Sequence, residues 1–441
     1  MQCCERSHSV RRHVWPVVWF MLPGPAVAAG ASEEELPLPG DTTLLREATD
    51  GVEFDASARL RLEYPDRKLI EPDDNDRELA LVRALGAIDA QRGVLRGLLQ
   101  LGAHRASPDR DNPTRTNDID VHQAFVEVAP ERESDRRLTR LRVGRAEMVY
   151  EFVGLRDSPN VRRTWDGARV TIVRPGLTAN AFAVQLVQPE SGGFDDNSDG
   201  TDRLSGIHLS LEQGTLGPFE ATAWYYDVRQ DRIEFLSGEG RAETKLAALV
   251  VEASAGNVEF SVGGGHQWGR FNGRDIDAHY IESELGYRWA DRRVPALLAL
   301  RYSAFSGGRS DSDRLTTFNP LFPNFAYSTE AALQSPSNLI KAALLAEVEA
   351  SETIKLEYRG EALWRYSAAD AFYTPVGTPL IPPDGSADRS LGVQQQLQVT
   401  WKATPRFTVS GAVVHFAPHR FLERAGVSDG LFGMLELEAE F

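Results

Sequence analysis

The chain has 441 residues, of which 64 are acidic and 48 are basic, so its formal net charge is −16. An acidic balance of this size argues against a nucleic-acid-binding protein, which would show basic patches. The two cysteines, Cys3 and Cys4, lie at the very start of the chain, so the remainder has no thiol with which to form a disulfide.

The N-terminus has the features of a secretory signal peptide. Three arginines precede an apolar stretch at residues 14–26, and the small residues of 26–28 offer the cleavage site that a signal peptidase requires. The apolar stretch is too short to span a membrane as a helix. We therefore expect residues 1–28 to be removed, residues 29–51 to form a periplasmic segment, and residues 52–441 to form the folded protein.

Strict alternation of apolar and polar residues dominates the rest of the chain. Residues 54–64, 354–366 and 391–402 are the clearest examples, and each run is longer than strands in soluble sheets usually are. Such runs suit tilted strands that cross a bilayer with one face towards lipid and the other towards a wet lumen. The pattern predicts eighteen strands, at residues 52–64, 77–89, 93–104, 120–128, 138–146, 166–174, 178–188, 203–212, 217–229, 241–255, 257–270, 277–290, 295–305, 338–350, 353–366, 390–402, 406–418 and 431–441.

The connections between these strands alternate in length. Residues 175–176 form one of the short connections, whereas 230–240 and 306–337 are among the long polar ones. Short periplasmic turns opposite long external loops are typical of bacterial outer-membrane barrels. Two connections fit this scheme less well, because 129–137 is long for a periplasmic turn and 271–276 is short for an external loop.

The last predicted strand adds an independent sign of the same fold. Apolar residues alternate with three glutamates there, and the chain stops at Phe441. Outer-membrane barrels commonly end on such a strand, which the barrel-assembly machinery recognises. The sequence therefore predicts an all-β protein, a closed antiparallel transmembrane β-barrel of about 18 strands that is embedded in the lipid of the bacterial outer membrane.

The alternation also assigns side chains to the lumen. The arginines on the polar face of their strands include Arg59, Arg61, Arg142, Arg169, Arg359 and Arg365, and also Arg96, Arg140 and Arg288. Arginine binds carboxylates and phosphates bidentately, so these residues are candidates to line a pore for an anionic solute. The alternative is that they only solvate the inner wall.

Residues 141–170, LRVGRAEMVYEFVGLRDSPNVRRTWDGARV, resemble the alginate-export family of outer-membrane porins. In that family a Leu-Arg-x-Gly-Arg strand end leads into an external loop with Arg-Asp, and an Asn-Val-Arg-Arg return follows. Residues 319–323 and 415–422 are also similar to the family. The resemblance implies an 18-stranded barrel with an electropositive pore that is partly closed by loops and passes an anionic polysaccharide outward.

The resemblance adds solute contacts to those assigned by alternation. The candidates in this block are Arg142, Arg145, Arg156, Asp157, Arg162, Arg163, Asp166 and Arg169. Arg145 falls on the lipid-facing side of a straight strand, so it needs a bulge or a position beyond the edge of the bilayer. The alternative for the block is an arginine–aspartate network that holds a loop in place.

One external loop resembles part of a calcium-binding motif. In residues 195–202 the positions of Asp195, Asn197, Asp199 and Gly200 match the first half of a calcium loop, but Gly206 stands where the bidentate glutamate belongs. The sequence therefore favours a solvated acidic loop, and no metal ion or cofactor is predicted.

The functional prediction is a channel that is not an enzyme. The sequence has no Gly-x-Ser-x-Gly, no His-Glu-x-x-His and no glycine-rich phosphate loop. We expect an outer-membrane channel that exports an alginate-like polysaccharide or oligosaccharide through an arginine-lined pore. A general or uptake porin for small anions is the alternative within the class, and an outer-membrane enzyme or adhesin is the alternative outside it.

Overall fold

A computed structural model describes residues 51–65, 78–129, 137–290 and 293–441. The predicted signal peptide and all but the last residue of the predicted periplasmic segment lie outside these residues, as does most of the connection 129–137. In the described part of the chain, no helix is long and apolar enough to cross a bilayer.

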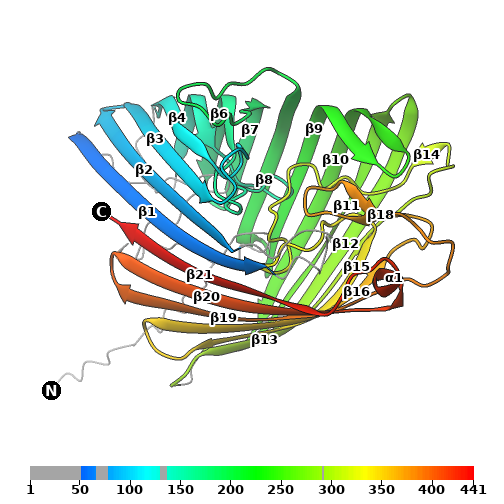
Figure 1. Ribbon diagram of the computed structural model, residues 1–441. Helices are drawn as coiled ribbons and strands as arrows, with labels where there is room; N and C mark the ends of the chain where they lie inside the picture. Colours follow the sequence, from blue (N-terminus) through cyan, green and yellow to red (C-terminus); the bar gives the residue numbers. More distant parts are fainter. Residues whose placement is uncertain (1–50, 66–77, 130–136, 291–292) are drawn as a thin grey trace.

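Eighteen long antiparallel strands close into one barrel (Figure 1). Every strand predicted from the alternation is present, and the first strand pairs with the last, so that Arg61 lies opposite Glu436. The barrel strands are β1 (Gly51–Pro65), β2 (Leu79–Arg92), β3 (Leu95–Ser107), β4 (Asn117–Val128), β5 (Leu138–Glu147), β6 (Thr164–Arg174), β7 (Leu177–Leu186), β8 (Asp202–Leu216), β9 (Phe219–Phe235), β10 (Gly238–Ala255), β11 (Val258–Phe271), β12 (Arg274–Trp289), β13 (Ala296–Phe305), β15 (Leu339–Glu349), β16 (Ile354–Arg365), β19 (Ser390–Thr404), β20 (Phe407–Pro418) and β21 (Gly430–Glu440).

Four short elements lie in the external loops. They are β14 (Arg314–Leu315), β17 (Phe372–Tyr373), β18 (Pro379–Ile381) and the helix α1 (Arg420–Arg424). β14 adds two parallel pairs to the edge of β12, and β17 and β18 form a separate small hairpin.

The prediction of a long external loop at residues 230–240 is wrong. β9 and β10 continue as a hairpin in which Phe235 lies opposite Gly238. The next external hairpin, formed by β11 and β12, also turns tightly between Phe271 and Arg274. The reason is that apolar burial continues beyond the predicted strand ends. Phe235 and Phe271 are both buried, and their rings pack edge to face with centroids 5.1 Å apart.

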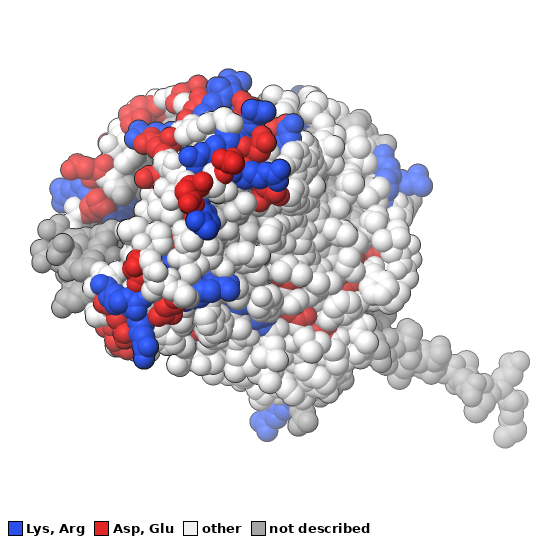
Figure 2. Space-filling model, turned by 90° about the vertical axis from the view of Figure 1, so that its right-hand side faces the viewer, with Lys and Arg blue, Asp and Glu red and all other residues white. Residues whose placement is uncertain are grey.

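The outer and inner faces of the wall differ as the alternation predicts. On β5, Leu141 and Val143 are 43% and 53% exposed, whereas Arg142 between them is 3% exposed. Figure 2 shows charged side chains of both signs gathered in groups, beside a broad part of the wall that carries few charges. This apolar outer face is the surface that a barrel presents to lipid.

Two external loops fold back into the barrel and fill much of its interior. We call them the inner loops, 148–163 between β5 and β6 and 306–338 between β13 and β15. They pair with each other, since the amide of Gly154 donates to the carbonyl of Phe322 at 2.8 Å and the amide of Phe322 donates to that of Phe152 at 3.1 Å. Phe152 also packs against Tyr280 of β12, with ring centroids 5.0 Å apart.

Two facing glycines lie near the external ends of β5 and β6, beside the first inner loop. Gly144 and Gly167 are paired across the two strands and have φ values of +133° and +158°, which side chains other than glycine rarely adopt. A Cβ atom on either residue would lie 2.3 Å from a backbone oxygen of the neighbouring strand. Both positions therefore require glycine.

Replacement of Gly167 by alanine tests this requirement. We expect Gly167→Ala to destabilise the folded barrel by about 1–3 kcal/mol, because the backbone must leave its φ or the strands must separate. The measurement is the temperature at which the folded band disappears on a semi-native gel. Gly97→Ala is the control, since a Cβ there has its nearest neighbour at 3.9 Å. Equal melting of the two variants would contradict the requirement.

Candidate functional site

The carboxylate of Asp157 fastens the tip of the first inner loop to the barrel wall. It accepts hydrogen bonds from Arg59 Nη1 at 2.6 Å, Arg83 Nη1 at 2.7 Å and Arg162 Nε at 2.5 Å. Burial alone would raise the pKa of the Asp157 carboxyl, but the attraction of Arg162, Arg83 and Arg59 outweighs it and holds this pKa well below its ordinary value. Asp157 therefore remains an anion that links the loop to β1 and β2.

Asn160 reinforces this attachment through backbone contacts. Its side-chain amide donates to the carbonyl oxygens of Val82, Arg105 and Arg115, at 3.1, 3.3 and 2.9 Å. Its Oδ1 accepts a hydrogen bond from Arg59 at 3.1 Å. A fully buried side chain with this many partners defines one position for the loop.

The second inner loop is also attached to β1. Arg61 contacts Glu330 of this loop at 2.9 Å, Glu63 at 2.6 Å and Glu436 of β21 at 3.5 Å. The amide of Glu330 donates to Gln396 of β19 at 2.8 Å. Arg59 and Arg61, both on β1, thus hold one inner loop each.

Arg163 connects the two inner loops to each other. Its guanidinium is buried and donates to the carbonyl oxygens of Gly154 and Phe322, the latter at 2.9 Å. Burial, with a smaller effect from the nearby Arg156, lowers the pKa of Arg163 well below its usual value. These contacts with backbone carbonyls favour a structural role for Arg163.

A second set of arginines lies on the inner wall nearer the periplasmic end. We call Arg96, Arg140, Arg142 and Arg169 the arginine group. Arg142 and Arg169 lie opposite each other on β5 and β6. Arg142 contacts Glu127 at 2.7 Å and stacks 4.0 Å above the ring of Phe125.

The remaining contacts of the arginine group involve two carboxylates. Arg140 contacts Glu127 at 3.1 Å, and Arg96 contacts Asp89 at 2.5 Å. Carboxylates on neighbouring strands therefore hold the guanidinium groups of Arg96, Arg140 and Arg142 in fixed positions on the inner wall.

Arg145 and Asp166 lie near the external end of the wall. Arg145 Nε contacts Asp166 at 2.9 Å, and its other nitrogens donate to the carbonyl oxygens of Val121 and Asp196. Arg145 directly follows Gly144 near the external end of β5, and its guanidinium is paired there.

Three further candidate residues hold loops. Arg156 donates to the carbonyl of Val161 at 3.2 Å, and burial lowers its pKa to about 10. Arg359 donates to the carbonyl of Ser328 in the second inner loop. Arg365 is fully buried, donates to the carbonyls of Ala368 and Asp370, and stacks 3.6 Å above the ring of Phe421.

The structure thus brings the sequence candidates together in three places, one of which is the contact between Arg145 and Asp166. Arg59, Asp157 and Arg162 meet at the first inner loop, while Arg142 and Arg169 face each other on the wall. The sequence prediction missed Arg83 and Asn160. Arg83 could have been predicted from the alternation, because it lies on the same face of β2 as Asp89. No local sequence pattern indicated that Asn160 would attach the loop to the wall.

A closed barrel with an apolar outer face, a charged inner wall and two inward-folded loops defines an outer-membrane channel of the porin type. Residues 51–431 match the family model described as alginate export. The chain therefore belongs to the alginate-export family, which confirms the resemblance found in residues 141–170. Membership of this family also identifies the chain as a channel protein rather than an enzyme.

Solved structures of similar fold agree with this assignment. Pseudomonas aeruginosa OccD3 (OpdP) is 13% identical with a TM-score of 0.61, and the alignment covers 90% of this chain and 92% of that chain. Acinetobacter baumannii OccAB1 is 10% identical with a TM-score of 0.60 and coverages of 88% and 96%. P. aeruginosa OccK2 (OpdF) in complex with glucuronate is 10% identical with a TM-score of 0.56 and coverages of 88% and 97%. No curated protein matches the chain.

Replacement of Asp157 by asparagine should release the first inner loop. The variant leaves Arg59, Arg83 and Arg162 without their shared anion, a loss on the order of 3–5 kcal/mol for a buried ion pair. We expect a larger and noisier single-channel conductance, because the loop no longer fills its part of the lumen. Asp311→Asn is the matched control, since Asp311 pairs with Arg309 at 3.0 Å at an exposed site in the other inner loop.

The pH dependence follows from the lowered pKa of Asp157. The ionised carboxylate stabilises the docked loop above the ordinary carboxyl pKa of about 3.9, and this contribution is lost only as the pH falls through the lowered pKa. The wild-type conductance should therefore remain constant from pH 7 to about pH 4. A wild-type channel that opens over this interval, or an Asp157→Asn channel with wild-type conductance, would contradict the assignment.

Proposed function

We propose that this channel exports an anionic polysaccharide or oligosaccharide of the alginate type, with the arginine group as its contact surface for the carboxylates of the polymer. The observation that carries the proposal is the placement of four arginines on the inner wall, on β3, β5 and β6. The planar guanidinium binds a carboxylate through two parallel hydrogen bonds. Arg140 and Arg142 are two residues apart on β5, so they offer successive contacts about 7 Å apart along the strand.

The position of these arginines explains how an acidic protein can favour an anionic solute. The net charge of −16 includes many residues outside the barrel wall, where salt screens carboxylates that lie more than a Debye length from the solute. Field lines focus inside a narrow channel with low-dielectric walls. Fixed guanidinium groups on that wall therefore act on the solute more strongly than the distant loop carboxylates do.

Membership of the alginate-export family supports both the solute class and the outward direction. Alginate is a polymer of uronic acids, and OccK2, a protein of similar fold, has been crystallised with glucuronate, a single uronic acid. The same complex favours a second candidate function, an uptake porin for small anions such as sugar acids. Recognition of the last strand by the barrel-assembly machinery stays a prediction.

The ion preference of the channel tests the role of the arginine group. In planar bilayers with a salt gradient, the reversal potential of the wild type should indicate anion selectivity. Arg142→Gln combined with Arg169→Gln should reduce this selectivity, and low salt should enlarge the difference. The control is Arg314→Gln, because the Arg314 side chain is exposed on β14, away from the arginine group, and pairs with Asp277. A cation-selective wild type, or a double variant with unchanged selectivity, would refute the proposal.

Block of the ion current by uronates separates the two candidate functions. If the channel carries a polymer, alginate fragments of increasing length should block the current with rising affinity, because more carboxylates meet the arginine group at once. If it serves small anions, glucuronate should block as well as the longer fragments do. Neutral oligosaccharides of equal length are the control for simple obstruction.

A further inference from the structure

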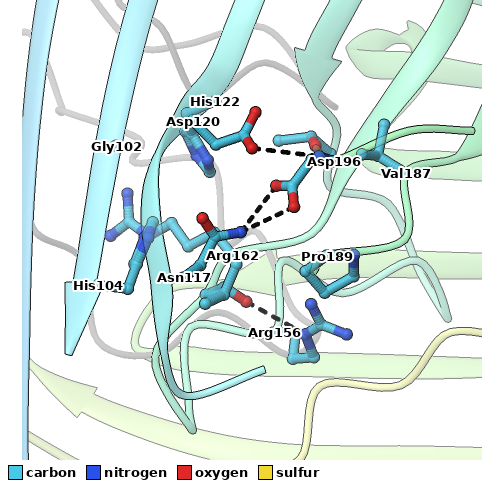
Figure 3. A pocket seen from close by; sticks show the side chains of 12 residues that line it. Gly102, His104, Asn117, Asp120, His122, Arg156, Arg162, Val187, Pro189 and Asp196 are labelled. Atoms are coloured by element: carbon cyan, nitrogen blue, oxygen red, sulfur yellow. Dashed lines mark hydrogen bonds between the residues drawn. The ribbon is translucent and has the colours of Figure 1, made fainter. Parts of the chain in front are cut away.

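A small polar cavity lies at the external end of β3 and β4, beneath the loop 187–201 that joins β7 to β8 (Figure 3). Its volume is about 10 Å³, which is close to the room that one water molecule or one ion needs. Its lining includes His104, Asn117, Asp120, Arg162 and Asp196. The cavity lies outside the arginine group, and Arg162 is the residue that it shares with the Asp157 contacts.

Three carboxylates converge beside this cavity. One oxygen each of Asp120, Asp195 and Asp196 lies within 4.8 Å of the other two. The backbone maintains this arrangement, because Oδ2 of Asp120 accepts hydrogen bonds from the amides of Asp195 at 2.9 Å and Asp196 at 3.1 Å.

Two buried side chains at the cavity have polar atoms without a hydrogen-bond partner in the described chain. Asn117 is 1% exposed, and its Nδ2 points at both oxygens of Asp196, at 2.8 and 2.9 Å, while its Oδ1 accepts no hydrogen bond from any described residue (Figure 3). His104 is 3% exposed, and neither of its ring nitrogens has a partner in the described chain. Each such group costs about 1–3 kcal/mol unless a ligand or water satisfies it.

We propose that Asp120, Asp195 and Asp196 bind a divalent cation, and that this cation is calcium. Calcium takes six to eight oxygen ligands in flexible geometry, so carboxylates from a strand and from a loop suit it. Asp195 is exposed, which leaves room for water molecules to complete the coordination shell. Asn117 contacts Asp196 directly, so a water molecule of this coordination shell would be placed to donate a hydrogen bond to the buried Oδ1 of Asn117.

This ligand set differs from the one that the calcium-loop motif would supply. The side-chain amide of Asn197 donates a hydrogen bond to the backbone carbonyl of Asp195 at 3.1 Å. The carboxylate of Asp199 accepts hydrogen bonds from the backbone amide and the hydroxyl of Thr201. Neither belongs to the converging group. The bound cation would instead link β4 to the loop 187–201, next to the external end of the channel, whatever solute the channel carries.

Calcium titration of the full-length chain in detergent tests the proposal. After removal of divalent ions with a chelator, calorimetry with calcium alone should show one saturable site per chain. Asp195→Asn and Asp196→Asn should each weaken this site by about tenfold or more. Asp199→Asn is the matched control in the same loop and should bind as the wild type does. Copurified lipopolysaccharide, which also binds calcium, contributes equally to all four proteins.

The outcomes are distinguishable from a folding defect. Each variant is first checked for the heat-dependent gel shift of a folded barrel. If Asp196→Asn does not fold, the calcium affinity of Asp195→Asn tests the proposal, because Asp195 is exposed. Absence of saturable binding in the wild type would overturn the proposal. Equal affinities in all four proteins, or a loss confined to Asp199→Asn, would overturn it as well.

Discussion

The structure depends on one constraint, that no strand of the sheet may be left without a neighbour inside the bilayer. Unpaired backbone amides and carbonyls cost several kcal/mol in hydrocarbon, so the sheet must close on itself. The pairing of β1 with β21 satisfies this requirement. Closure in turn assigns every second side chain to the lumen, and this places charged residues such as Arg61 and Glu436 within a buried interior where they must pair.

The interior combines two kinds of stabilisation. Aromatic side chains such as Phe152, Phe318 and Tyr280 pack the inner loops against the strands β12 and β13. Charged contacts centred on Asp157 and Glu330 attach the same loops to β1. The apolar contacts fill volume without strong directionality, whereas the ion pairs select one position for each loop, so the shape of the remaining lumen depends mainly on a few charged residues.

The sequence predicted the barrel well because alternation is a local property. All eighteen strands and the inward orientation of Arg59 and Arg142 follow from which residues are two positions apart. The hairpin at Phe235 was missed, because the burial of Phe235 depends on a contact with Phe271 in the hairpin of β11 and β12. The three arginines around Asp157 could not be predicted from spacing, because they come from β1, β2 and the loop itself and meet only once that loop folds inward.

The position of the loop anchors on β1 has a consequence for the order of folding. Arg61 meets Glu436 across 375 positions of sequence, one of the longest separations available to this chain, and contacts of such high contact order form late. Arg59 and Arg61 are also the residues that fasten the two inner loops. Pairing of the first and last strands therefore brings Glu436 within 3.5 Å of both arginines, so that one carboxylate of the closing strand is shared by the attachment points of the two loops.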